Sequence, residues 1–117
     1  MSKHVLIVDD EDDIRFLLQG LLEDEKYQTS VAASAKVARE KIAEQRYDAV
    51  ILDVWLQNGS DEGLQLLSEM LEKDPFVPVI MISGHSTIET AVSAIKKGAY
   101  DFLEKPFKSE RLLTMVK

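Results

Sequence analysis

The sequence contains no cysteine among its 117 residues. Disulfide bonds, zinc sites with thiolate ligands and cysteine nucleophiles are therefore excluded. Long hydrophobic runs are also missing, because no apolar stretch approaches the roughly 20 residues that a membrane-spanning helix needs. The first four residues lead into only four aliphatic residues and then into acids, which does not fit a secretion signal. These features predict a soluble, cytoplasmic protein with no membrane association.

Positive charge is scarce as well. The chain has 14 lysines and arginines against 21 aspartates and glutamates, which gives a net charge of −7 at neutral pH. A protein that neutralises nucleic acid phosphates needs clustered basic residues, so this segment is not expected to bind nucleic acid. The length fits a single domain that is large enough to bury a core.

What the chain does contain is a series of short apolar segments. They cover residues 5–8, 29–32, 49–52, 79–82 and 100–103. Three of them (5–8, 49–52 and 79–82) are almost continuously apolar, as is typical of parallel strands that are covered on both faces. The sequence therefore predicts five strands, of which 29–32 is the weakest.

Apolar residues at helical spacing follow each of these segments. The five patterns are Ile14, Leu17, Leu18, Leu21 and Leu22; Val37, Ala38 and Ile42; Leu64, Leu67 and Leu71, flanked by Leu66 and Met70; Ile88, Ala91, Val92 and Ile95; and Leu112, Leu113 and Val116. Five strand–helix units in one short domain predict an α/β fold with an open, doubly wound parallel sheet and right-handed crossovers.

Polar residues stand where four of the predicted strands end. Asp9 and Asp10 follow the first strand, Asp53 the third, Ser83 the fourth and Lys105 the fifth. Ligands of open parallel sheets bind beyond the carboxyl ends of the strands. We therefore expect three carboxylates, a hydroxyl and an ammonium group to converge at one edge of the sheet.

Gathered carboxylates repel each other, and a divalent cation removes the conflict. A set of hard oxygen ligands suggests Mg²⁺. Lys105 could pair with Asp53 when no cation is bound. An aspartate beside Mg²⁺ and a lysine is suited to attack phosphorus and form an aspartyl phosphate, with Ser83 bonding a phosphoryl oxygen.

Taken singly, each residue also has an ordinary structural interpretation. Asp9 or Asp10 alone would more often cap a helix, and Ser83 or Lys105 alone would be a strand-end hydroxyl or a surface lysine. Two further acids, Asp12 and Asp13, are expected to favour the N-terminus of the first helix through its dipole. The two histidines, His4 and His85, are expected to face solvent rather than to bind a metal.

Other functional classes have less support in the sequence. The strand "AVILD" resembles an ATPase strand with a Mg²⁺-binding aspartate, but neither G-x-x-x-x-G-K-[ST] nor G-x-G-x-x-G occurs. Ser83-Gly84-His85 does not match the G-x-S-x-G motif of hydrolases. A phosphohydrolase with an aspartate nucleophile shares the expected chemistry, but it usually needs a cap domain, for which this chain has no room.

The residues resemble the receiver domains of two-component response regulators over essentially the whole chain. The resemblance rests on Asp9-Asp10, Asp53, Ser83 and "EKPF" at residues 104–107. It implies a flavodoxin-like (βα)5 fold with a five-stranded parallel sheet in the strand order 2-1-3-4-5. It also implies a phosphoacceptor signalling domain rather than an enzyme, which assists its own phosphotransfer and slow dephosphorylation. A receiver that is never phosphorylated would usually lack the acceptor aspartate or the lysine.

The resemblance also assigns a role to each residue of the site. Asp53 would accept a phosphoryl group from a sensor histidine kinase, and Lys105 would neutralise that group. Asp10, Asp53 and the main-chain carbonyl of Trp55 would bind Mg²⁺, with Asp9 acting through water. Two further roles complete the set, with Ser83 as the switch hydroxyl and Phe102 as the switch aromatic residue.

The stretch "ISGHSTIETAVSAIKKGAYDFLEKPF" is similar to receivers of the NtrC/NtrX branch, and "DVWLQNGSDEG" favours NtrX. Residues 1–117 would then be a receiver excised from a longer transcriptional regulator with an ATPase and a DNA-binding domain. A homodimer through the fourth helix, fifth strand and fifth helix is possible in this branch. Most receivers have proline where Gln57 stands, and Gly63 comes two residues later than usual, so the loop before the third helix is expected to differ in shape.

Overall fold

The structure is a computed structural model that describes residues 3–56, 62–84, 88–105 and 107–116. Each predicted strand and helix is present. Their bounds are β1 (His4–Val8), α1 (Asp12–Asp24), β2 (Gln28–Ala32), α2 (Ala35–Glu44), β3 (Ala49–Asp53), α3 (Glu62–Lys73), β4 (Val79–Ser83), α4 (Ile88–Lys96), β5 (Asp101–Glu104) and α5 (Ser109–Val116). Among the described residues, no helix is both long enough and apolar enough to span a bilayer.

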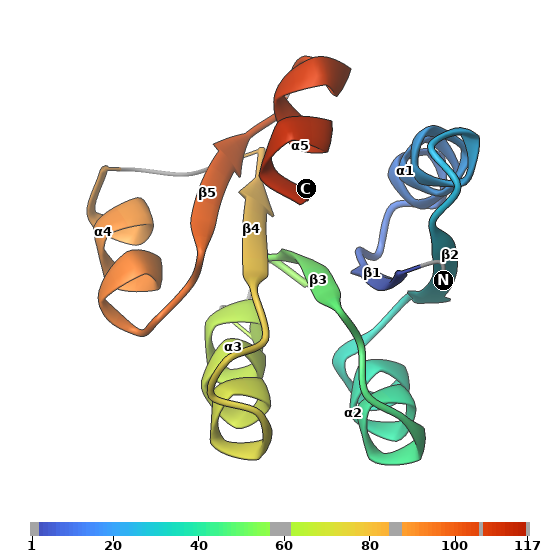
Figure 1. Ribbon diagram of the computed structural model, residues 1–117. Helices are drawn as coiled ribbons and strands as arrows, with labels where there is room; N and C mark the ends of the chain where they lie inside the picture. The colour runs from blue at the N-terminus through green and yellow to red at the C-terminus, as the bar shows by residue number, and fades with distance from the viewer. Residues whose placement is uncertain (1–2, 57–61, 85–87, 106, 117) are drawn as a thin grey trace.

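The five strands form one parallel sheet in the order β2-β1-β3-β4-β5, which confirms the predicted fold. Figure 1 shows α1 and α5 above one face of the sheet and α2 and α3 below the other, with α4 beside β5 at the edge. All carboxyl ends of the strands therefore point to one edge, and all amino ends to the opposite edge.

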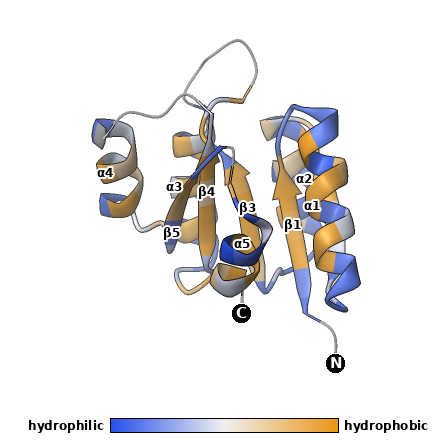
Figure 2. Ribbon diagram, turned by 90° about the horizontal axis from the view of Figure 1, so that it is seen from above, coloured by the Kyte–Doolittle hydropathy of each residue, from blue (hydrophilic) through white to orange (hydrophobic). Residues whose placement is uncertain are grey.

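Alternating strand residues build a separate core on each face. On β1, Val5 and Ile7 pack with residues of α1 and α5, while Leu6 and Val8 pack with residues of α2 and α3. The central strands β1, β3 and β4 are apolar over most of their length because both of their sides are covered, and Figure 2 shows these parts in orange. This double burial explains why the sequence patterns located the central strands so closely.

The apolar patterns located the helices correctly, but they did not always identify the side of the helix that is buried. In α4, Ala94 is fully buried, whereas Val92 and Ile95 from the predicted apolar set are 45% and 48% exposed. In α3 the residues buried most deeply are Gly63, Leu66, Leu67 and Met70, while Leu64 and Leu71 are only partly buried. The helix α4 lies beside β5, which is an edge strand of the sheet.

At the amino ends of the strands, polar groups form a local network around His4. Its Nε2 lies 2.8 Å from Ser30 Oγ and its Nδ1 lies 2.8 Å from Gln45 Nε2. The ring stands edge-on to Tyr47 at a centroid distance of 5.0 Å, and the His4 N–H donates to Asp48 Oδ2 at 2.7 Å. His4 is partly exposed and is held by these contacts, whereas His85 lies outside the described residues.

Candidate functional site

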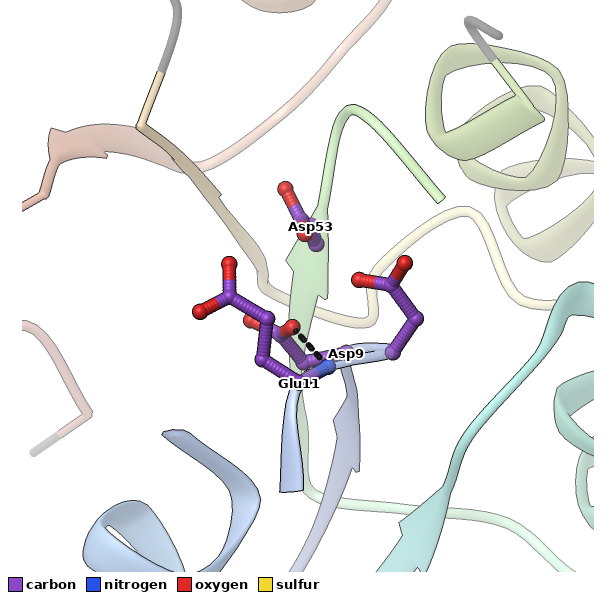
Figure 3. A group of neighbouring side chains, drawn as sticks. Asp9, Glu11 and Asp53 are labelled. Carbon is purple, nitrogen blue, oxygen red and sulfur yellow. Dashed lines mark hydrogen bonds between the residues drawn. The ribbon is translucent and has the colours of Figure 1, made fainter. Parts of the chain in front are cut away.

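Two buried carboxylates lie next to each other at the carboxyl edge of the sheet. Val8, the last residue of β1, pairs with Leu52 of β3, so the residues that follow them, Asp9 and Asp53, come side by side. Asp9 is fully buried and Asp53 is 3% exposed. Figure 3 shows both side chains at the ends of their strands, with Glu11 beside them.

Lys105 brings a positive charge to these carboxylates from the end of β5. Its Nζ lies 2.9 Å from Asp9 Oδ2 and 3.6 Å from Asp53 Oδ2. It also lies 3.3 Å from Glu11 Oε1. The main-chain N–H of Lys105 donates to Ser83 O at 2.8 Å, which holds the lysine beside β4. The predicted pairing with Asp53 is present, but Asp9 and Glu11 are closer to the ammonium group.

The acidic cluster is larger than the sequence predicted. Asp9, Asp10, Glu11 and Asp53 each offer a carboxylate oxygen, and these four atoms all lie within 4.8 Å of one another. Asp10 and Glu11 are exposed, so the cluster opens to solvent. A compact set of hard oxygen atoms fits the coordination preference of Mg²⁺.

Glu11 is the site residue that the sequence analysis missed. Glu11 is the N-cap residue of α1, but its side chain makes no capping hydrogen bond. Instead, its main-chain N–H donates to Asp9 Oδ1 at 2.9 Å and its carboxylate reaches Lys105. Its place directly after Asp9-Asp10, in the loop that leaves the carboxyl edge of the sheet, is the signal that could have identified it.

The next two acids, Asp12 and Asp13, lie in the first turn of α1, as predicted. Arg15 pairs with the Asp12 carboxylate. The same guanidinium donates to the main-chain oxygen of Asp9 at 2.7 Å. Arg15 therefore joins the start of α1 to the loop that carries the acidic cluster.

Burial and crowding change the acidity of the site. Burial, followed by the charge of Asp9, raises the pKa of Asp53 to about 7, although Lys105 and the Trp55 N–H act in the opposite direction. Burial likewise raises the pKa of Asp9. For Lys105, burial lowers the pKa, but the bond to Asp9 and the neighbouring negative charges outweigh it and the pKa is raised. One ammonium group does not fully offset these carboxylates, so the site fits an additional cation.

The backbone after β3 holds Asp53 in place. Asp53 Oδ1 accepts a hydrogen bond from the Trp55 N–H at 3.2 Å. The Gly63 N–H donates to Val54 O at 3.0 Å. A Cβ atom on Gly63 would lie 2.1 Å from Asp53 O and 2.6 Å from Val54 Cα, so only glycine fits. Gly63, which comes two residues later in the sequence than in most receivers, therefore packs directly against the backbone of Asp53. Gln57, where most receivers have proline, lies outside the described residues.

The predicted switch residues flank the site. Ser83 is the last residue of β4 and is fully buried. Phe102 pairs with Met81 in the sheet and is partly buried against the core shared with α2 and α3. Trp55 is partly buried against the same core, and its indole Nε1 has no hydrogen-bond partner among the residues that the structure describes.

Comparison with known proteins agrees with this geometry. Residues 5–117 match the family described as the response regulator receiver domain. The chain is 51% identical over 115 residues to the nitrogen assimilation regulatory protein NtrX of Azorhizobium caulinodans, and the match covers 98% of this chain and 25% of that protein. The chain thus spans about a quarter of the length of this relative.

Two solved receiver domains are similar over nearly their whole length. The crystal structure of the receiver domain of NtrX from Brucella abortus has a TM-score of 0.87 and 52% identity, covering 94% of this chain and 92% of that chain. The solution structure of the beryllofluoride-activated NtrC4 receiver domain dimer has a TM-score of 0.89 and 43% identity, covering 97% and 92%. The chain therefore belongs to the family of response regulator receiver domains.

Proposed function

We propose that the domain accepts a phosphoryl group on Asp53 from a sensor histidine kinase. The observation that carries this proposal is a buried carboxylate at the end of β3, with a lysine ammonium 3.6 Å away and further carboxylates around it. Such a kinase draws its phosphoryl group from ATP, so the proposed place of action is the cytoplasm. The domain would act as a signalling module that takes part in its own phosphotransfer.

In the proposed reaction, a carboxylate oxygen of Asp53 attacks the phosphorus of a phosphohistidine. A P–O bond forms as the P–N bond breaks, and the electron pair leaves with the imidazole of the kinase. Lys105 is placed to offset the negative charge of the transferred group. Ser83, buried at the end of the neighbouring strand, would donate a hydrogen bond to one phosphoryl oxygen.

Mg²⁺ is the proposed cofactor. Asp10, Asp53 and the main-chain carbonyl of Trp55 would hold it directly, and Asp9 would hold it through water. When bound, the cation supplies positive charge that offsets the repulsion between the carboxylates and the incoming phosphoryl group. The pKa of about 7 for Asp53 supports this assignment, since a cation would favour the ionised carboxylate that the attack requires.

The proposed output is a conformational switch through Ser83 and Phe102. A phosphoryl group adds three acceptor oxygens and close to two negative charges. If Ser83 moves to bond one oxygen, Phe102 can turn further inward, and this inward state is expected to be populated before phosphorylation because Phe102 has no hydroxyl group to bond in either state. Its partial burial is consistent with that expectation.

The switch would change the surface formed by α4, β5 and α5. Val92, Ile95 and Tyr100 are exposed there by 45%, 48% and 63%. Such a patch could support a homodimer, as the similar NtrC4 receiver forms. The domain would then control ATPase and DNA-binding domains of a longer transcriptional regulator, and contact with DNA would belong to those domains.

The central experiment is intact-mass analysis after incubation with acetyl phosphate and Mg²⁺. We expect one phosphoryl mass on the wild-type chain and none on Asp53→Asn. Asp10→Asn should also suppress the gain because it removes a proposed metal ligand. Asp48→Asn is the matched control, because it makes the same chemical change at the opposite edge of the sheet, and it should be phosphorylated normally. A full phosphoryl gain on Asp53→Asn would refute the proposal.

A further inference from the structure

Glu11 and the Lys105 ammonium group form an ion pair that none of the proposed roles uses. We propose that Glu11 is a positioning residue, which holds Lys105 toward the loop after β1 and competes with the phosphoryl group for it. This role rests on the proposed phosphorylation of Asp53. Glu11 would thereby weaken the phosphorylated state and shift the balance toward the unphosphorylated form.

The distances show how the ammonium group is shared. Lys105 Nζ is 3.3 Å from Glu11 Oε1, which is closer than its 3.6 Å from Asp53 Oδ2. An ammonium group has three N–H donors, and Asp9 at 2.9 Å accounts for another of the contacts. Of these three carboxylates, only those of Asp9 and Glu11 lie within hydrogen-bond distance of the ammonium group, and Asp53 at 3.6 Å lies beyond it. Both bonded carboxylates therefore draw Lys105 away from a phosphoryl group on Asp53.

The burial of each carboxylate indicates which one would lose its contact with the Lys105 ammonium group. The Asp9 side chain is fully buried, so the loss of its ammonium partner would cost more than the same loss at an exposed carboxylate. The Glu11 side chain is 60% exposed, so its carboxylate can rotate into solvent and be hydrated there. The Lys105 side chain is only 11% exposed, which leaves it little room to find other partners. The contact between Glu11 and Lys105 is therefore the one that phosphorylation would break.

The experiment measures the affinity of the chain for beryllofluoride at saturating Mg²⁺, by calorimetry and by NMR titration. Glu11→Gln removes the charge and keeps the size, while Glu11→Asp keeps the charge but shortens the side chain by one methylene. We expect both variants to bind beryllofluoride about two- to fivefold more tightly than wild type, the range expected from one partly exposed ion pair. Asp13→Asn, which removes one exposed charge from the same acidic run, should bind as wild type does.

Three results would overturn the proposal. If Glu11→Asp behaves as wild type and Glu11→Gln does not, the effect comes from net charge and not from the ion pair. If Glu11→Asp binds Mg²⁺ more weakly in a separate titration, Glu11 is a metal ligand. If both variants bind beryllofluoride more weakly with Mg²⁺ affinity unchanged, Glu11 supports Lys105 instead of competing for it.

The design also separates this proposal from the proposed function. Wild type should bind beryllofluoride and Asp53→Asn should not. If wild type fails to bind, both proposals fall together. If wild type binds and both Glu11 variants match it, Asp53 remains the acceptor and only the role of Glu11 is refuted.

Discussion

The two edges of the sheet are both polar, but they balance their polar groups differently. At the amino edge, each ring nitrogen of His4 has one neutral partner, Ser30 or Gln45, and the Asp48 carboxylate accepts the His4 N–H. At the carboxyl edge, one ammonium group is shared among three carboxylates, two of them buried. Polar groups that match one another stabilise a fold, whereas buried charges in excess of their partners indicate a place for a ligand.

The direction of the chain explains why the excess of negative charge lies at the carboxyl edge of the sheet. The loops that follow parallel strands all leave the sheet there, so residues distant in sequence come together. Asp9, Asp53 and Lys105 come from three such positions, while the contacts of His4 reach the middle of β2, the end of α2 and the residue before β3. The following predictions test whether the two edges really divide function from stability in this way.

The largest effect is expected from Gly63→Ala. The new Cβ would lie 2.1 Å from Asp53 O and 2.6 Å from Val54 Cα, and these backbone atoms belong to the sheet end and cannot move aside easily. We expect a loss of about 3 kcal/mol or more in the free energy of unfolding, measured by urea denaturation, together with loss of phosphorylation.

Gly20→Ala provides the control for this substitution. Gly20 lies in α1, and a Cβ there would have no atom within 4 Å. Alanine should therefore stabilise the helix by about 0.5–1 kcal/mol and leave phosphorylation unchanged. Equal effects of the two substitutions would show that the close approach of Gly63 to Asp53 has no importance.

The second prediction concerns pH and the charge of Asp53. Its pKa is raised from an ordinary value of 3.8 to about 7 by burial and by Asp9. Between these pH values the folded state binds more protons at Asp53 than the unfolded state does. The contribution of Asp53 to stability in the absence of metal is therefore fully present below about pH 4 and is lost as pH rises through 7. Asp53→Asn should remove this loss and be about 2–4 kcal/mol more stable than wild type at pH 8 in EDTA.

Unfolding in urea at pH 4, 6 and 8 measures this difference. Added Mg²⁺ should stabilise wild type more at pH 8 than at pH 5, because the cation favours the ionised carboxylate. Asp48→Asn, at the amino edge, should not gain stability with rising pH relative to wild type. If Asp53→Asn is no more stable than wild type at pH 8 in EDTA, the assignment of Asp53 as a carboxylate with too few positive partners is contradicted.

The sequence predicted the sheet well because both faces of β1, β3 and β4 are covered, and double burial leaves a continuous apolar run. It predicted Asp9, Asp53, Ser83 and Lys105 at one edge because strand ends mark that edge. It did not predict the contact between Glu11 and Lys105, since that depends on how two long side chains lie across 94 positions of sequence. Helical spacing likewise located α4 but not its buried side, which depends on its place beside an edge strand.

A smaller effect is expected at the amino edge, from His4→Phe. The aromatic ring and its packing against Tyr47 are kept, but the contacts to Ser30 and Gln45 are lost. We expect a cost of about 1–2 kcal/mol in the free energy of unfolding, with unchanged phosphorylation by acetyl phosphate. A reduced phosphorylation rate in a fully folded variant would mean that the two edges are coupled.

The smallest effect is expected from Trp55, whose main chain and side chain serve different regions. Its N–H donates to Asp53 Oδ1, while its indole is partly buried against the core that includes residues of α2 and α3. The indole lies only two residues from the acceptor, so it can restrict the approach of water to a phosphoryl group there. We predict that Trp55→Ala loses phosphate about two- to fivefold faster than wild type, a change of less than about 1 kcal/mol in the barrier.

Trp55→Phe keeps most of the bulk and removes the indole N–H, which has no partner among the described residues, so it should lose phosphate at close to the wild-type rate. The rates are measured by intact mass after removal of acetyl phosphate. If Trp55→Ala is less stable but loses phosphate at the wild-type rate, the indole belongs to the core alone and the shielding hypothesis is wrong.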